Sequence, residues 1–417
     1  MLQLWFFLNT FWAFSVEIGV HKIGLSIILL SLIAVFWLLQ NTKITDFTIK
    51  VAVIGFLGMI YYFLIGYIGL CTDKFEKSYL TSPLLLFLVL VGLEVGWRAS
   101  DDDWLKLQRT VKWILLTAFI GFAVEMIVPS WFPNQVGYRF EGSYSGWFYE
   151  PSHVAISLFP SLVVLLLSGN KVNQRYGVLA MLVLLLLSHA STLIMLCMVW
   201  VGYLTIVKSH SSKIVLVSSS VLMVFMLVYV GFMFFAQDAF EVFFAPFIER
   251  FEGVVGGVYE TTNISSLVYI QGWQDAWANF QRTNGLGLGF NMMGCNPLPD
   301  TLSRFVLNQT ELNSEDGSFM ASKLISELGV IGISLLVIVL LWWIKLEIRN
   351  RAIVNHNLHI AILNTQAALI FIGFVTLFLR GGGYFNAAFL LPLVAISASV
   401  KRYKISTNFL NQRDSKI

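Results

Sequence analysis

Long apolar runs, separated by short polar segments, recur along almost the whole chain. A helix of about 20 apolar residues crosses the ~30 Å hydrocarbon core of a bilayer. Only 12% of the 417 residues are charged, whereas a soluble domain carries about 25%. This composition excludes a soluble enzyme, a disordered protein and a nucleic-acid-binding protein, and three scattered cysteines exclude a disulfide-stapled secreted module. The sequence therefore predicts an all-α polytopic membrane protein.

The apolar runs predict about twelve spans, in a single integral membrane domain over residues 1–417. The predicted spans are 2–20, 23–40, 50–70, 80–97, 111–129, 151–168, 174–188, 191–207, 214–236, 319–344, 358–379 and 384–400. The pattern leaves two alternatives at 188–191. Either two spans are separated there, or one long bent helix reduces the count by one.

Lysine and arginine set the predicted orientation. With both termini in the cytoplasm, 18 of the 27 Lys and Arg residues fall in cytoplasmic segments, as the positive-inside rule requires. Two loops then lie outside: a short one at 130–150, rich in aromatic residues, and a large one at 237–318. Within the large loop, Ile270, Trp273 and Trp277 fall at helical spacing among polar residues, which indicates an amphipathic helix.

Arginines on the predicted outer side are the first candidates for chemistry. The planar guanidinium binds phosphate oxygens in a bidentate manner and stays charged when partly buried. The large loop is net acidic, so its arginines are either ion-pair partners or individual anion ligands. Arg380 is distinctive because three glycines and Tyr384 follow it at the predicted membrane surface, where a charge must be paired or reach water. The candidates are Arg139, Arg250, Arg282 and Arg380.

Two further candidates lie where a predicted span begins. Glu150 precedes Pro151, so it is either a helix N-cap or a general base close in sequence to Arg139. His153 competes with it as the base. The chain lacks the signatures of a nucleotide-phosphate loop, a zinc protease and a paired-cysteine site. We therefore expect neither a metal nor a cofactor.

Several of these residues, taken in order, resemble the signature of bacterial Wzy-type O-antigen polymerases. The matching segments are Arg139-x-x-Gly142, Glu150-Pro151-Ser152, Trp273-x-x-Ala276, Gly285-x-Gly287-x-Gly289, Ser326-Glu327-Leu328-Gly329-Val330-Ile331-Gly332 and Arg380-Gly381-Gly382-Gly383-Tyr384. The resemblance covers residues 139–395. One departure lies just before Trp273, where Tyr269 and Gln271 stand in place of a family arginine that Arg250 or Arg282 could supply.

The resemblance implies a metal-independent, inverting glycosyltransferase with a membrane fold similar to the GT-C class. It places the chain in the bacterial inner membrane, with undecaprenyl-pyrophosphate-linked glycans as substrates, membrane lipid around it and a chain-length regulator protein as a candidate partner. Its implied site comprises Arg139, Glu150 and His153 as catalytic residues, Arg139, Arg250, Arg282 and Arg380 as pyrophosphate ligands, and Trp147, Tyr149 and Tyr384 as sugar contacts.

Other functions compete with polymerisation. A ligase of the same superfamily would transfer the finished glycan to a lipid A core, although Glu150 before Pro151 and the segment at 380–384 favour the polymerase. A lipid-linked oligosaccharide flippase also has about twelve spans, but it should carry charge along a central cavity and needs no outer loop of 82 residues. A non-enzymatic scaffold leaves the placement of the arginines unexplained.

Overall fold

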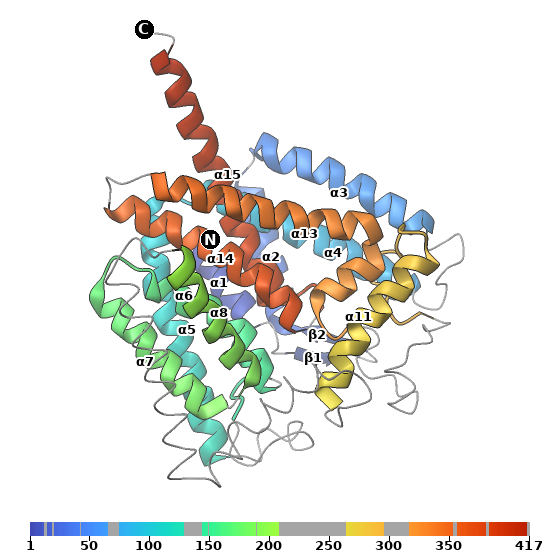
Figure 1. The fold of residues 1–417 in the computed structure, drawn as a ribbon, viewed down its shortest axis with the longest axis horizontal. Coiled ribbons are helices and arrows are strands. Elements are labelled where there is room, and N and C mark those ends of the chain that lie inside the picture. The colour runs from blue at the N-terminus through green and yellow to red at the C-terminus, as the bar shows by residue number, and fades with distance from the viewer. Residues whose placement is uncertain are drawn as a thin grey trace.

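The computed structural model of the chain is a bundle of helices with one short β-hairpin near the N-terminus (Figure 1). It describes residues 1–11, 15–18, 21–41, 43–65, 75–128, 144–148, 150–188, 190–207, 264–295, 317–352, 357–380 and 383–414. The helices are α1 (Leu2–Thr10), α2 (Leu25–Gln40), α3 (Asp46–Ile65), α4 (Phe75–Arg98), α5 (Asp101–Ile127), α6 (Pro151–Leu166), α7 (Lys171–Ser188), α8 (Ser191–Val207), α11 (Ile264–Arg282), α13 (Met320–Ala352), α14 (Asn357–Leu379) and α15 (Ala387–Asp414).

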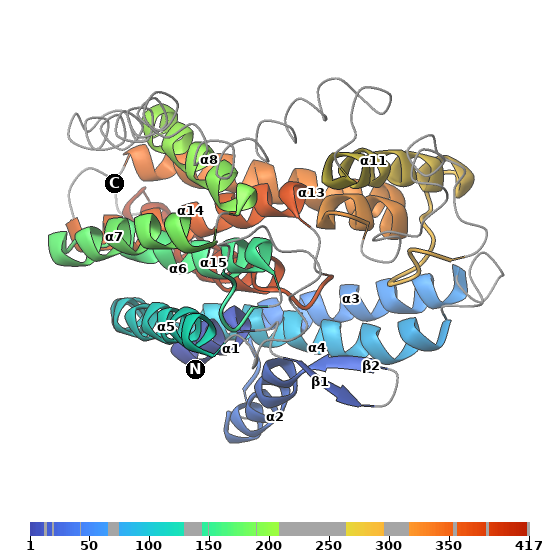
Figure 2. The same ribbon diagram turned by 90° about the horizontal axis from the view of Figure 1, so that it is seen from below.

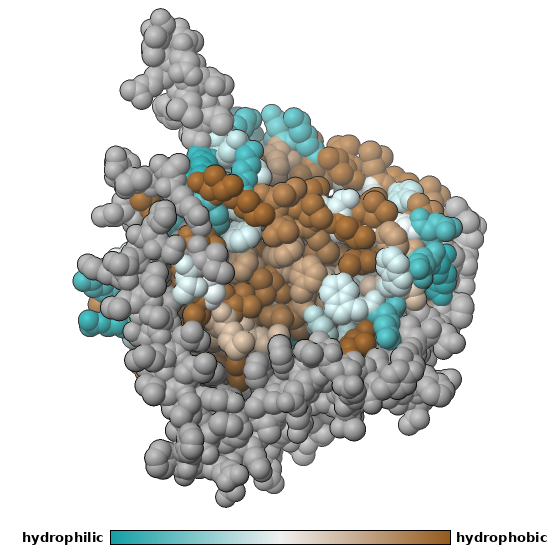
Figure 3. All heavy atoms as spheres, in the orientation of Figure 1, coloured by the Kyte–Doolittle hydropathy of each residue, from teal (hydrophilic) through white to brown (hydrophobic). Residues whose placement is uncertain are grey.

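Five of the described helices are long and apolar enough to cross a membrane, namely those with candidate spans in α3, α4, α5, α13 and α14. Parts of α2, α6 and α8 form shorter apolar helices. Large apolar side chains on α3 and α13 are exposed, Ile54 and Ile338 among them, and Figure 3 shows a broad hydrophobic face over α13. The chain is therefore a multi-pass helical membrane protein. The count of twelve spans stays a prediction, and the span at 214–236 lies outside the described residues.

The first predicted span, 2–20, is wrong. Helix α1 ends at Thr10, and the chain then forms β1 (Ser15–Ile18), which pairs antiparallel with β2 (His21–Gly24). The physical reason is local. In Ser-Val-Glu-Ile, polar and β-branched residues alternate with the period of a strand, whereas a lipid-exposed helix needs an unbroken apolar run.

The break proposed at 188–191 is present as two separate helices. Helix α7 ends at Ser188 and α8 begins at Ser191. Both pack against α6, so the chain reverses there instead of continuing as one bent helix.

The first part of helix α15 lies inside the bundle, and its C-terminal part projects from it (Figure 1). It packs on α4 and on α14, and α14 in turn packs on α13. Figure 2 shows α11 and α13 on one side and α3, α4 and α5 on the other, with α14 and α15 between them. Two glycines allow this close packing, because a Cβ on Gly96 would overlap the carbonyl of Val394, and one on Gly373 would overlap the ring of Pro392.

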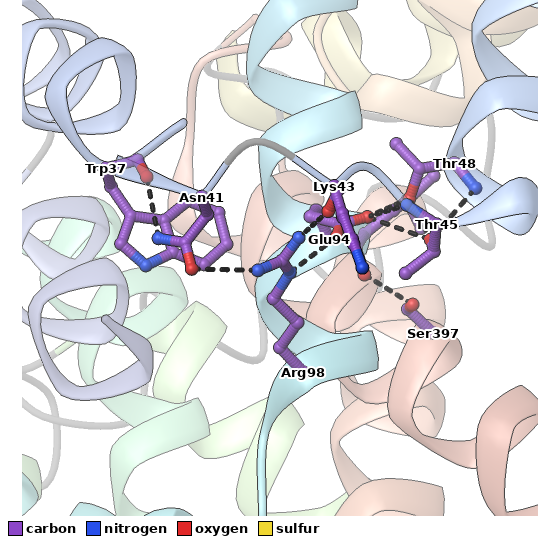
Figure 4. Close-up of polar contacts among 9 residues, drawn as sticks. Trp37, Asn41, Lys43, Thr45, Thr48, Glu94, Arg98 and Ser397 are labelled. Atoms are coloured by element: carbon purple, nitrogen blue, oxygen red, sulfur yellow. Dashed lines mark hydrogen bonds and ion pairs between the residues drawn. The ribbon is translucent and has the colours of Figure 1, made fainter. Parts of the chain in front are cut away.

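A buried carboxylate joins α3 and α4 at the end of the bundle where α4 ends (Figure 4). Glu94 is 1% exposed and accepts hydrogen bonds from the hydroxyls of Thr45 (2.8 Å) and Thr48 (2.6 Å), as well as from Nε of Arg98 (2.6 Å). Arg98 also donates to the side chain of Asn41 at 2.9 Å. We call Glu94, Arg98, Thr45 and Thr48 the Glu94 cluster. Its charge and hydrogen bonds are satisfied internally, as a structural role requires.

Candidate functional site

Glu150 occupies the N-cap position of α6, and Pro151 is the first helical residue. Its backbone is extended, with φ −150° and ψ 161°, but its side chain makes no capping hydrogen bond. The carboxylate instead accepts hydrogen bonds from the hydroxyl of Ser152 and from Nη2 of Arg380. The helix start therefore positions Glu150 without using its side chain, which leaves the carboxylate available for other contacts.

Arg380 follows the last residue of α14 and forms an ion pair with Glu150, which lies 230 residues earlier in the chain. Nε2 of His153 lies 3.3 Å from the same carboxylate oxygen, Oε1. The side chains of Glu150 and Arg380 are each 30% exposed. We call Glu150, Ser152, His153 and Arg380 the Glu150 cluster. The structure thus brings together three of the residues predicted from sequence.

The electrostatics of the Glu150 cluster keep its carboxylate ionised. Burial alone would raise the pKa of Glu150, but the charges of Arg380 and His153, together with hydrogen bonds from Ser152 and Arg380, lower it to about 2. A carboxylate with this pKa is a weak proton acceptor at neutral pH. It holds cations well, so the geometry favours Glu150 as the partner that orients Arg380 and His153.

The segment before Glu150 is held by another buried carboxylate. Glu125, near the end of α5, accepts the backbone N–H groups of Ser145 (2.9 Å) and Gly146 (2.6 Å). Trp147 donates its indole N–H to the carbonyl of Thr117 at 2.8 Å and packs on α5. These contacts place Trp147 on α5, partly exposed, and its predicted contact with a sugar stays a prediction.

A turn that follows α11 at 283–295 and contains Gly285, Gly287 and Gly289, here called the glycine turn, packs against a break in α13. At Gly329 the backbone leaves the helical conformation, with φ 54° and ψ −129°. A continuous helix would bond the Val330 N–H to the carbonyl of Ser326. Here Val330 donates to the carbonyl of Gly285 (2.8 Å), and the Ser326 carbonyl accepts the N–H of Leu288 (3.0 Å). The turn therefore replaces hydrogen bonds that the break removes, as buried backbone requires.

Tyr384 lies beside this break. It is 3% exposed, and its hydroxyl donates to Oε2 of Glu327 at 2.6 Å, while its ring stacks on Phe290 with centroids 4.6 Å apart. This conformation leaves little of the ring for a sugar, and the predicted sugar contact stays untested. Sequence reasoning assigned no role to Glu327 or to Lys323, which lies 3.6 Å from it. The sequence did contain a signal for these residues: Lys323 and Glu327 are two charges, four residues apart, at the start of an apolar span.

The remaining predicted residues fall elsewhere or outside the described residues. Arg282 ends α11 and donates to the side chains of Asn279 (3.1 Å) and Cys295 (3.7 Å), which belong to α11 and to the glycine turn. Arg139, Tyr149 and Arg250 lie outside the described residues, as do most of the loop at 130–150 and much of the loop at 237–318. Their predicted roles stay predictions.

The amphipathic helix predicted in the large loop corresponds to α11. Its polar residues face inward: Gln271, Asp275 and Asn279 are between 1% and 3% exposed, whereas Trp273 and Trp277 are 40% and 62% exposed. The ring of Trp273 also lies near Phe319 and Phe378, at the ends of α13 and α14 that meet the site. The helix thus presents its aromatic side outward, as a helix in contact with lipid does.

A scan of protein-family models gives no match for this chain, and a search of curated proteins finds none similar to it. The argument for function therefore depends on the residues and their geometry. Within the described ranges, no group of three or more His, Cys, Asp or Glu side chains is arranged to hold a metal ion.

Proposed function

We propose that this chain is an O-antigen polymerase. In this proposal it joins undecaprenyl-pyrophosphate-linked repeat units on the periplasmic face of the bacterial inner membrane. The observation that carries the proposal is the ion pair between Glu150 and Arg380, with His153 beside it. Glu150 and Arg380 come from two of the segments that resemble the polymerase signature, and the fold brings them into contact.

The proposed chemistry is glycosyl transfer with inversion. A hydroxyl of the lipid-linked acceptor attacks the anomeric carbon of the donor glycan, and the bond to the donor's pyrophosphate breaks. Negative charge then develops on the pyrophosphate oxygens, which an arginine can stabilise when partly removed from water. Arg380 contacts Glu150 through Nη2, and a guanidinium has five N–H donors. The rest of its fork is the proposed ligand for the pyrophosphate.

The proton of the acceptor hydroxyl is assigned to His153. Since the pKa of Glu150 is lowered to about 2, this carboxylate accepts a proton poorly at neutral pH. An imidazole usually titrates near pH ~6.5, and a neighbouring carboxylate stabilises its protonated form. In this proposal Glu150 orients both His153 and Arg380, while undecaprenyl pyrophosphate and the lengthened glycan leave as products.

Two observations support an outer location for the site. Cys295, at the end of the glycine turn, is disulfide-bonded, and structural disulfides persist in oxidising compartments such as the periplasm. The opposite end of the bundle carries a concentration of cations, as cytoplasmic ends do. Those in described helices there include Arg98, Lys106, Lys345 and Arg402.

The direct test uses purified protein in lipid nanodiscs, supplied with undecaprenyl-pyrophosphate repeat units but no nucleotide. Products are resolved by length. A ladder of multiples of the repeat unit is the expected result. Transfer only after lipid A core is added would replace the polymerase with a ligase. Neither product from an active substrate would favour a transporter instead.

A further inference from the structure

Glu327 is a charged side chain with no exposed surface, near the start of α13. Its carboxylate accepts hydrogen bonds from the hydroxyl of Tyr384 (2.6 Å) and from the backbone N–H groups of Asn291 (2.7 Å) and Met293 (3.0 Å). Nζ of Lys323 lies 3.6 Å from it. We call Glu327, Lys323 and Tyr384 the Glu327 cluster.

The cluster is balanced in charge as well as in hydrogen bonds. Lys323 is 2% exposed, and its ammonium also lies 5.5 Å from the centroid of the Tyr384 ring. Removing two charges from water is costly, and the cost is offset only when geometry and hydrogen bonds are good. An apolar core of the same shape would be at least as stable, so stability does not account for the charges. Such networks fix one arrangement of the chain segments that meet at them.

Three segments meet at Glu327. The first is α13 at its break, the second is the glycine turn, and the third is the loop that joins α14 to α15. The turn packs closely on α13, because a Cβ on Gly287 would overlap the carbonyl of Glu327, and the N–H of Gly289 donates to that same carbonyl (3.1 Å). The loop contributes Tyr384, which is four residues beyond Arg380.

The loop is also fixed where α15 begins. The side-chain amide of Asn386 donates to the carbonyl of Gly383 (2.8 Å) and accepts the N–H of Phe389 (2.9 Å). Arg380 is held at its other side by α14, through a bond from its N–H to the carbonyl of Thr376 (3.3 Å). The position of Arg380 is therefore set between the end of α14 and the anchored side chain of Tyr384.

We propose that Glu327 and Tyr384 are positioning residues for Arg380. The contact of Tyr384 with Glu327 anchors the chain four residues beyond Arg380, so that Arg380 meets both Glu150 and the anionic leaving group of the donor. This inference rests on the proposed function for its readout. The contact between Tyr384 and Glu327 itself does not depend on the length of the donor glycan.

The test compares two buried tyrosines that donate to adjacent residues of α13. Tyr384→Phe removes the hydroxyl that contacts Glu327. Tyr62→Phe is the matched control, because the Tyr62 hydroxyl, on α3, donates to the backbone carbonyl of Leu328 (2.8 Å), whereas Tyr384 donates to the side chain of Glu327. Unfolding temperature, kcat and KM are measured for both in nanodiscs, with rates divided by the amount of folded protein.

We expect the two variants to unfold at similar temperatures but to differ in turnover. Tyr384→Phe should lower kcat by about 10- to 100-fold, because a displacement of ~1 Å at a reacting group has an effect of this order, while Tyr62→Phe should stay within about 2-fold of the native protein. Glu327→Gln should lower kcat similarly, and the double variant Glu327→Gln/Tyr384→Phe should be no worse than either single one, since both disrupt one contact.

Two results would overturn the positioning role: equal turnover for the Tyr384→Phe and Tyr62→Phe proteins, or additive losses in the double variant. Failure of the proposed function looks different. In that case the native protein makes no ladder, or Arg380→Ala makes as much as the native protein. The two tyrosine variants are therefore compared once the native protein has proved active and the Arg380→Ala variant inactive.

Discussion

Two glutamate–arginine pairs lie at opposite ends of the bundle, and their surroundings differ. Glu94 and Arg98 are four residues apart on one helix, and the carboxylate is 1% exposed and satisfied by two threonines. Glu150 and Arg380 are 230 residues apart, and each is 30% exposed. The carboxylate of the first pair is closed off from solvent, although Arg98 is 29% exposed. The second leaves part of each charged group accessible, as a site that receives an anionic ligand needs.

The difference between the pairs also concerns what each holds. The Glu94 cluster fixes the start of α3 against the end of α4 (Figure 4). The Glu150 cluster joins the start of α6 to the end of α14, two helix ends that are far apart in the sequence. Identical residue types therefore form a structural contact at one end and the site of our proposed chemistry at the other, and the exposure of the carboxylate and its surroundings distinguish them.

The largest expected effect is on polymerising activity, which should depend on the Glu150–Arg380 pair and not on the Glu94–Arg98 pair. Arg380→Ala should lower ladder formation by about 100- to 1000-fold, the range for removing a group that stabilises transition-state charge. Arg380→Lys should retain part of the activity, because it keeps the charge but not the planar fork. Arg98→Ala, the same substitution in the other pair, should leave the turnover of folded protein unchanged. Equal losses for Arg380→Ala and Arg98→Ala would contradict the distinction.

The second effect is on the free energy of unfolding, which should depend on the Glu94–Arg98 pair. Arg98→Ala leaves the buried Glu94 without its charge partner and should lower the free energy of unfolding by about 2–3 kcal/mol, allowing for the partial exposure of Arg98. The control is Lys106→Ala, which removes another contact with a carboxylate four residues away, but with both side chains more than half exposed. Thermal unfolding should not change measurably for it. A large shift for Lys106→Ala would show that burial is not the deciding factor.

The smallest effect concerns pH. Because the folded-state pKa of Glu150 is lowered to about 2, below the ~4.3 of a free glutamate, its ionised form stabilises the fold fully above about pH 4.3. This contribution is lost as the pH falls toward 2. Glu150 therefore adds no step to a rate profile between pH 5 and 8. If His153 accepts the proton, the rate should fall as acidification protonates the imidazole, and a weakly active His153→Gln protein should lack this fall. A flat profile with an active His153→Gln variant would return that role to Glu150.

Much of the membrane architecture follows from local sequence. The apolar runs at 80–97, 111–129 and 358–379 became helices, because a run of this length and composition can satisfy its backbone in lipid only as a helix. The helix pair at 174–188 and 191–207 followed in the same way. The N-terminal hairpin was missed, since summed hydrophobicity hid the alternation at 15–18.

The candidate site was predictable residue by residue but not as an arrangement. Arg380 and Glu150 each attracted attention as charges beside predicted spans. Nothing local indicated that they touch, and the importance of Glu327 was hidden because its hydrogen-bond donors come from two distant segments. Hydrophobic periodicity reports how one helix meets its surroundings, not which other helix it meets.

The sequence by itself determined that this chain is a helical, multi-pass membrane protein with selected charges beside its spans. Composition and run length decide this, because the bilayer imposes the same constraint on every span. Only the tertiary structure decided that α13 breaks at Gly329 and that the glycine turn supplies the missing hydrogen bonds. It also decided that Arg380 meets Glu150. These contacts depend on the packing of distant helix ends, where burial and charge pairing act between residues that no local pattern connects.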